Sequence, residues 1–199
     1  YCVIQESVAI FDNVLNDGDA FPLLTKIKTI GDLVMVVAGL PSTAASALAT
    51  GDSSDTAAVD SSTGNAYLQQ LSAFAFAVAD RVEWRWEQRT VSAGIHCGPL
   101  VGGVIGDDRL VYDCFGNTVN VASRVMSTSG AGVWALEAMA AAAGAVAAPQ
   151  RRTSIDDVDA PPIAASVAAP AVFFMGESKP VVSKGHGTLT VTRILPANA

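Results

Sequence analysis

This chain is organised around residues Val91–Gly130, which read VSAGIHCGPLVGGVIGDDRLVYDCFGNTVNVASRVMSTSG. The first part of this stretch contains short apolar segments at Val91–Ile95, Leu100–Ile105 and Leu110–Tyr112, and Asp107–Asp108 separates the last two. Short apolar or alternating segments joined by turn residues are typical of β-strands. The stretch therefore predicts strands that include a tight hairpin.

The second part of the stretch changes period and predicts a helix. Its apolar residues recur at helical spacing from Val119 to Met126. Asn117 or Thr118 can cap the start of this helix, and Gly130 can end it. The pattern of strands followed by a helix indicates a domain of the α+β class.

Asn120 and Arg124 are four residues apart and therefore lie on one face of the expected helix. An arginine offers several donors in a rigid plane, and a neighbouring amide can orient a hydroxyl group, so the pair suits a sugar phosphate. An ordinary exposed helix face explains the same spacing. Only a wider pattern can choose between these two interpretations.

The rest of the chain alternates between strand and helix patterns. An amphipathic helix is expected at Tyr1–Leu15, a hairpin of Thr25–Ile30 and Leu33–Ala38, and a second helix at Tyr67–Val82. Beyond Gly130 we expect a short strand with an Ala-rich helix in 131–148, then strands at 172–175 and 188–194. Residues 42–64 and 149–170 have no apolar period and are interpreted as flexible insertions.

Three blocks of the sequence together resemble the catalytic domain of class III nucleotidyl cyclases, the family of adenylate and guanylate cyclases. These are KIKTIGDLVMVVAGLP at Lys26–Pro41, the part of the opening stretch at Gly94–Arg124, and KGHGTLTVTRIL at Lys184–Leu195. The resemblance implies one domain over residues 1–199, with a ferredoxin-like antiparallel sheet covered by helices. It also implies head-to-tail dimers whose active sites form between two domains.

The resemblance assigns nucleotide-binding or catalytic roles to five residues. Lys28 and Asp113 would read the purine ring. The Lys28 donor complements the N1 acceptor of adenine, and the Asp113 acceptor complements its 6-amino donor. Guanylate cyclases of the family usually have Glu and Cys there, and we interpret Cys114 as a packing residue. Asn120 would position the ribose and Arg124 would stabilise the charge on the α-phosphate. Lys184 would hold the terminal phosphates.

Asp32, in the turn after Lys28, would bind metal, because the family uses two aspartates to hold two Mg²⁺ or Mn²⁺ ions. The family's other aspartate belongs to a strand before the first helix, so we interpret the chain as a fragment whose first strand is missing. One carboxylate is insufficient for two ions. The isolated fragment is therefore expected to be inactive. It is also expected to be poorly stable, because loss of the first strand exposes the middle of the sheet.

Composition restricts the partners. The chain of 199 residues is half apolar, carries a formal net charge of -7 and has a pI near 4.6. These values argue against nucleic-acid and membrane-surface binding, which require clustered basic residues. The odd set Cys2, Cys97 and Cys114 is typical of reduced, partly buried thiols and an intracellular location at the cytoplasmic face. No signal peptide or apolar span is present, although an upstream membrane anchor is compatible with the chain.

The function expected from the resemblance is adenylate cyclase activity, a phosphorus–oxygen lyase reaction. The ribose 3′-hydroxyl of ATP would attack the α-phosphate in line, giving 3′,5′-cyclic AMP and pyrophosphate. The partner would be a second cyclase domain, in a homodimer or a heterodimer. The alternative is a catalytically incomplete cyclase-like half that binds nucleotide and complements or regulates a partner domain.

Overall fold

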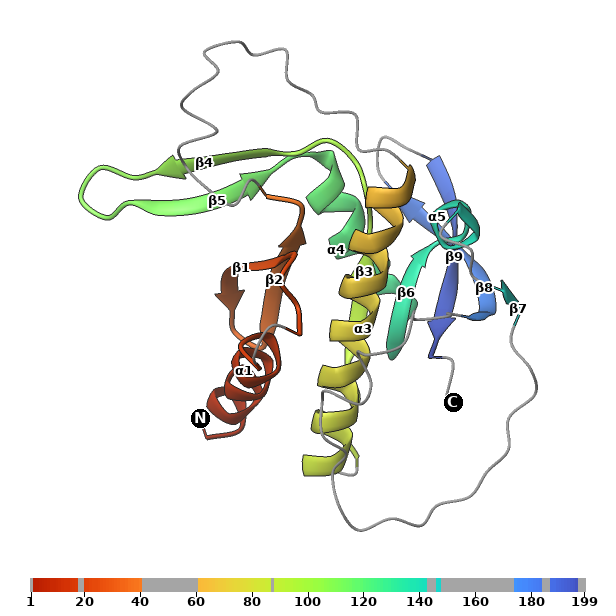
Figure 1. The fold of residues 1–199 in the computed structure, drawn as a ribbon, viewed down its shortest axis with the longest axis horizontal. Coiled ribbons are helices and arrows are strands. Elements are labelled where there is room, and N and C mark those ends of the chain that lie inside the picture. Colours follow the sequence, from red (N-terminus) through yellow and green to blue (C-terminus); the bar gives the residue numbers. More distant parts are fainter. Residues whose placement is uncertain are drawn as a thin grey trace.

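A computed structural model of the chain describes residues 2–17, 20–40, 61–86, 88–142, 146–147, 174–183 and 187–196. Single helices are separated by one to three strands along the described chain (Figure 1). The helices are α1 (Cys2–Leu15), α3 (Ser61–Arg85), α4 (Asn117–Ser129) and α5 (Glu137–Ala142). The strands are β1 (Leu24–Ile30), β2 (Leu33–Ala38), β3 (Ser92–Ile95), β4 (Val101–Ile105), β5 (Val111–Phe115), β6 (Gly132–Leu136), β7 (Val146–Ala147), β8 (Phe174–Ser183) and β9 (Gly187–Leu195).

The strands form one larger sheet and two hairpins. The larger sheet has five strands in the order β3-β6-β9-β8-β7, with β9 antiparallel to both of its neighbours. Parallel pairs occur at β3–β6 and β7–β8. The hairpins β1–β2 and β4–β5 each form a separate antiparallel sheet. The predicted α+β class with antiparallel pairing is confirmed.

Helix α3 lies between the five-stranded sheet on one side and α1 with the β1–β2 hairpin on the other, and it packs against both (Figure 1). On one side, its residues Leu68 and Ala75 join a core with Ile95, Val133 and Ile194 of the five-stranded sheet. On the other side, a core holds α3 against α1 and the residues around the β1–β2 hairpin; its buried members are Val14, Phe21, Phe74, Ala77, Val78 and Val82. Among the described helices, none is long and apolar enough to cross a bilayer.

Helix α4 packs its apolar side on the sheet and leaves its polar side exposed. Val121 and Val125 are buried together with Trp134 of β6, Val181 of β8 and Val191 of β9. The residues of α4 on the opposite side are exposed to solvent. This amphipathic arrangement fixes which face of α4 can meet a ligand.

The described elements correct several predicted details. Helix α3 begins at Ser61 and not at Tyr67, so residues 61–64 of the expected insertion are helical. Packing of the later turns of α3 outweighs the weak helix propensity of this segment. The expected strand at 172–175 is β8, which extends to Ser183. The remainder of the two insertions, 42–60 and 149–170, lies outside the described residues.

The ends of α4 test the capping predictions. Neither Asn117 nor Thr118 caps the helix, because the N-cap position is Gly116 and no side chain makes a capping hydrogen bond. The C-terminal end is at Gly130, as predicted, with a φ of 79° that glycine adopts without strain. The β4–β5 hairpin and the β1–β2 hairpin are both confirmed.

Candidate functional site

Lys28 and Asp113 meet although they are 85 residues apart in the sequence. Lys28 lies on β1 and donates from Nζ to Oδ2 of Asp113 on β5, at 2.6 Å. The register of β1 against β2 shifts between Lys26 and Lys28. Such an irregularity re-aims side chains, and the two lysines have different partners: Lys26 Nζ lies 2.5 Å from Oδ1 of Asp12 on α1.

The Asp113 carboxylate is held in its ionised form. The hydrogen bond from Lys28 is the largest cause that lowers the pKa of Asp113, and the backbone N–H of Cys114, which donates to Oδ1 at 2.8 Å, lowers it further. Partial desolvation opposes both effects. An ionised carboxylate only accepts hydrogen bonds, whereas the lysine ammonium only donates them. The pair therefore presents one donor and one acceptor side by side.

Cys114 is buried and packs in the interior, as predicted. Its side chain is 2% exposed, and burial is the main cause that raises the pKa of its thiol. Cys97 is also a free thiol but is exposed, so the expectation of partly buried cysteines is wrong for Cys97. Its position directly after β3, where the chain leaves the sheet, accounts for that exposure.

Asn120 and Arg124 both lie on the exposed side of α4, one turn apart. The backbone carbonyl of Arg124 accepts hydrogen bonds from the hydroxyls of Ser127 and Thr128 at 3.3 and 2.5 Å. In the part of the chain that the structure describes, no ion pair occupies the Arg124 guanidinium. Helix α4 starts directly after β5, so this face follows closely on the strand that carries Asp113.

Asp32 is exposed at the tip of the β1–β2 hairpin. The described residues contain no group of three or more His, Cys, Asp or Glu side chains that could hold a metal ion. A carboxylate oxygen suits Mg²⁺ or Mn²⁺, but one carboxylate does not fill the oxygen shell of either ion. The described residues therefore do not fit a complete two-metal site. Lys184, the expected triphosphate ligand, lies outside the described residues.

Two contacts near these residues are absent from the sequence-based expectations. Thr118 was a capping candidate, yet its hydroxyl donates to the backbone carbonyl of Pro99 at 2.6 Å. Lys179 of β8 donates to the carbonyl of Ser129 at the end of α4, and its Nζ lies 4.3 Å from the centroid of the Trp134 ring. Neither contact has a signature in the local sequence, because each joins segments that only the fold brings together.

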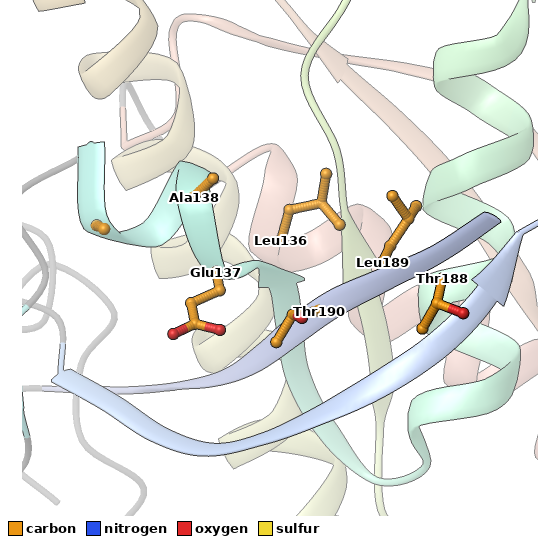
Figure 2. Close-up of a pocket in the computed structure, with 7 residues that line it drawn as sticks. Leu136, Glu137, Ala138, Thr188, Leu189 and Thr190 are labelled. Carbon is orange, nitrogen blue, oxygen red and sulfur yellow. The ribbon is translucent and has the colours of Figure 1, made fainter. Parts of the chain in front are cut away.

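A shallow hollow of about 450 Å³ lies between β6, α5 and β9 (Figure 2). It is lined mostly by apolar groups around Leu136 and Leu189, with Glu137 at its margin. Among the residues that the structure describes, none of the predicted site residues lines it. The hollow is thus formed by different elements from those that hold Lys28, Asp113, Asn120 and Arg124.

Comparisons with known proteins agree with this arrangement. Residues 2–150 match the adenylate and guanylate cyclase catalytic domain family. Adenylate cyclase type 9 of Xenopus laevis is 34% identical over 133 residues, which are 64% of this chain and 9% of that protein. The chain thus spans less than a tenth of the length of this curated relative.

Two solved structures have the same fold. The guanylate cyclase domain of RhGC from Catenaria anguillulae, in complex with GTP, superposes with a TM-score of 0.58 at 17% identity, covering 96% of this chain and 81% of that one. The adenylyl cyclase CyaB from P. aeruginosa gives a TM-score of 0.52 at 21% identity, covering 94% and 81%. With the family match over residues 2–150, the chain belongs to the class III nucleotidyl cyclases, as an adenylate and guanylate cyclase catalytic domain.

Proposed function

We propose that this chain is the catalytic domain of an adenylate cyclase that converts ATP to 3′,5′-cyclic AMP and pyrophosphate. The observation that carries this proposal is the Lys28–Asp113 pair, a fixed cationic donor beside an ionised acceptor. Adenine offers an acceptor at N1 and a donor at its 6-amino group. Guanine reverses the pattern at these two positions, so a rigid pair aimed at them favours ATP over GTP.

The pair can bind a base without giving up its internal contact. A lysine ammonium has three donors, and only one is needed for Asp113. The Asp113 carboxylate has further lone pairs beyond those used by Lys28 and the Cys114 amide. The ion pair therefore holds both side chains in place before the nucleotide arrives, which reduces the ordering cost of binding.

The exposed face of α4 supplies the groups for the reaction centre. Asn120 would orient the ribose, so that its 3′-oxygen faces the α-phosphorus. As the new bond to the 3′-oxygen forms and the bond to the bridging oxygen of pyrophosphate breaks, negative charge grows on the phosphate oxygens. Arg124 would stabilise that charge, and a positioned donor of this kind contributes roughly 2.7–4 kcal/mol by analogy with oxyanion-hole donors.

The proposal places Asp32 as one oxygen ligand of a divalent ion, Mg²⁺ or Mn²⁺, and Lys184 as a contact to the terminal phosphates. Divalent ions supply charge neutralisation and nucleophile activation to phosphoryl transfer in general. Asp32 lies on the same hairpin as Lys28, four residues further along, so base and metal contacts would come from one hairpin. No group of three or more His, Cys, Asp or Glu side chains that could complete such a site is found among the described residues.

The proposed partner is a second cyclase domain, and the β4–β5 hairpin is the surface that supports it. This hairpin extends away from the body of the molecule (Figure 1) and exposes large apolar side chains, with Val101 and Leu110 each 69% exposed and Val104 61%. A two-stranded hairpin with such exposure is marginal in water, and a partner that covers these apolar side chains would stabilise it. Both a homodimer and a heterodimer satisfy this requirement.

A second candidate function is a cyclase-like half that binds nucleotide and completes or regulates a partner's site. The observation behind it is that the described residues contain no group of three or more side chains that could hold a metal ion, although the carboxylate of Asp32 itself favours the enzyme. The two candidates differ in what the domain does alone: an enzyme homodimer turns over ATP, whereas a regulatory half does so only with its partner.

The test is product formation by the full-length protein, supplied with ATP or GTP and Mn²⁺ and analysed chromatographically. Adenylate cyclase activity predicts cyclic AMP in large excess over cyclic GMP, with loss of product in Asp32→Ala and Arg124→Ala variants. Preferential formation of cyclic GMP would overturn the ATP assignment. Nucleotide binding that depends on Lys28 and Asp113, without any product, would favour the regulatory half.

A further inference from the structure

The N-terminus of helix α4 has no side-chain cap. Its N-cap is Gly116, with φ 136° and ψ 172°, and no side chain makes a capping hydrogen bond. The backbone N–H of Asn120 donates to the carbonyl of Gly116 at 3.4 Å, which is long for such a bond. Because helix ends leave unsatisfied backbone groups and fray, the first turn of α4 needs another anchor.

Thr118 provides that anchor. It is 8% exposed, and its hydroxyl donates to the carbonyl of Pro99 at 2.6 Å, a short distance for such a bond. The fit around the hydroxyl is close, since a Cβ added at Gly98 would lie 2.8 Å from Thr118 Oγ1. The connection between β3 and β4 therefore packs directly against the first turn of α4.

The same connection is also tied to the strand that carries the base-reading aspartate. It leads into β4, whose first residue, Val101, pairs with Phe115 of β5. Phe115 comes two residues after Asp113 and two residues before the start of α4. Thus one short segment contacts both the end of β5 and the first turn of α4.

We propose that Thr118 is a positioning residue for cyclisation: its hydrogen bond to Pro99 sets where Asn120 and Arg124 stand relative to the Lys28–Asp113 pair. The proposal rests on the proposed function, because it concerns the alignment of ribose and α-phosphate with a base already bound. Asn120 is two residues from Thr118 and on the same first turns of the helix. A shift of this turn moves Asn120 directly and changes how Arg124 approaches the α-phosphate.

This role predicts an effect on turnover and not on base binding. A small displacement of a reacting centre lowers a rate steeply, whereas the Lys28–Asp113 pair on β1 and β5 is left in place. A purely structural role of Thr118 would instead lower stability, with turnover per folded molecule unchanged. Measurement of kcat per folded molecule therefore distinguishes the positioning role of Thr118 from a purely structural one.

The experiment compares Thr118→Val, which keeps the branched shape and removes the donor, with Thr118→Ser, which keeps the donor, in the full-length protein. The readouts are kcat for cyclic AMP and the Kd of ATP lacking its 3′-hydroxyl, a probe that binds but cannot cyclise. We expect the valine variant to lose at least about tenfold in kcat with Kd changed less than about twofold. The serine variant should retain most of the kcat.

A double-variant comparison makes the assignment specific. In a background that carries both Asn120→Ala and Arg124→Ala, Thr118→Val should cost little further kcat, because both groups that it positions are already gone. An equal loss in both backgrounds, or an unchanged kcat in Thr118→Val, overturns the proposal. If the valine variant does not fold, Gly98→Ala serves instead, since its Cβ displaces the Thr118 hydroxyl directly.

Failure of the proposed function would be visible separately. If the wild-type protein makes no cyclic AMP, the proposed function is wrong. Hydrogen exchange then tests separately whether the Thr118–Pro99 hydrogen bond holds the first turn of α4. The backbone amides of Asn120 and Val121, which donate to the first carbonyls of the helix, should exchange faster in Thr118→Val than in the wild type or Thr118→Ser. Unchanged exchange in the valine variant overturns the positioning role whatever the activity.

Discussion

Lys28 Nζ and Asp113 Oδ2 lie 2.6 Å apart, and their contact joins the β1–β2 hairpin to the β4–β5 hairpin. These hairpins belong to separate sheets, so the ion pair links two elements that no backbone ladder connects. The contact fixes the orientation of the two side chains relative to each other. The candidate base-reading pair is thus preorganised by the fold.

Reversing the hydrogen-bonding pattern of this pair should reverse the base preference. In a variant with Lys28→Glu and Asp113→Cys, the carboxylate accepts where the ammonium donated, and the acceptor of Asp113 is lost. We expect the ratio of ATP to GTP turnover to fall by at least about 100-fold, because unpaired polar groups in a site discriminate strongly. Initial rates with each nucleotide measure the ratio, and a ratio that stays constant would contradict the base-reading role.

Asp113 should remain ionised throughout the physiological pH range. Its pKa is lowered from the ordinary value of 3.8, so the stabilisation from its contacts is fully present above about pH 4 and is lost as the pH falls through the lowered pKa. The ratio of nucleotide affinities of the wild type and Asp113→Asn should then be constant from pH 7 to pH 5. A decline of this ratio within that window, measured by calorimetric titration, would show that Asp113 titrates there.

Removal of the Arg124 charge should lower turnover far more than binding. Arg124→Ala is expected to reduce kcat about 100- to 1,000-fold, since the lost interaction is made mainly with the transition state. Arg124→Lys should recover only part of the rate, because an ammonium cannot reproduce the planar fork. The matched control is Arg89→Ala, which removes an exposed arginine beside the Trp86 ring and should leave kcat unchanged. Equal effects of Arg124→Ala on kcat and on KM would argue against the assigned role.

A charge on the exposed hairpin should weaken self-association. Val104→Asp places a carboxylate in the apolar surface of β4, and we expect the dimer dissociation constant to rise at least about tenfold. Trp84→Asp is the matched control, because Trp84 is 64% exposed on α3, away from the hairpin. Sedimentation equilibrium measures both variants. Dimers that weaken equally in the two variants would place the interface elsewhere.

The metal dependence should respond to Asp32. Asp32→Asn removes one anionic oxygen ligand, and the Mn²⁺ concentration for half-maximal activity should rise at least about tenfold. Asp17→Asn, at an exposed position after α1, provides a control of equal charge. Removal of divalent ions with a chelator should abolish turnover in the wild type and in the control. An Asp32→Asn variant with unchanged Mn²⁺ dependence would exclude Asp32 as a ligand.

Much of the fold could be predicted from local patterns. The strand at Leu33–Ala38 has the expected bounds, and the helix between Gly116 and Gly130 follows the apolar spacing of its residues. The first residues of α3 could not be predicted, because Ser61–Gly64 have loop-like composition and are helical only as the start of a packed helix. Local propensity is a weak guide where tertiary contacts decide.

Local sequence patterns were enough to identify the family, the hairpins and the face of α4 that carries Asn120 and Arg124. Periodicity and motif order are properties of neighbouring residues, and they survive without knowledge of the fold. Only the tertiary structure decided that Thr118 bonds to Pro99 and does not cap its helix, and that Lys26 and Lys28 have different partners. Such contacts join segments distant in sequence and depend on how close two backbones come, which no local pattern encodes.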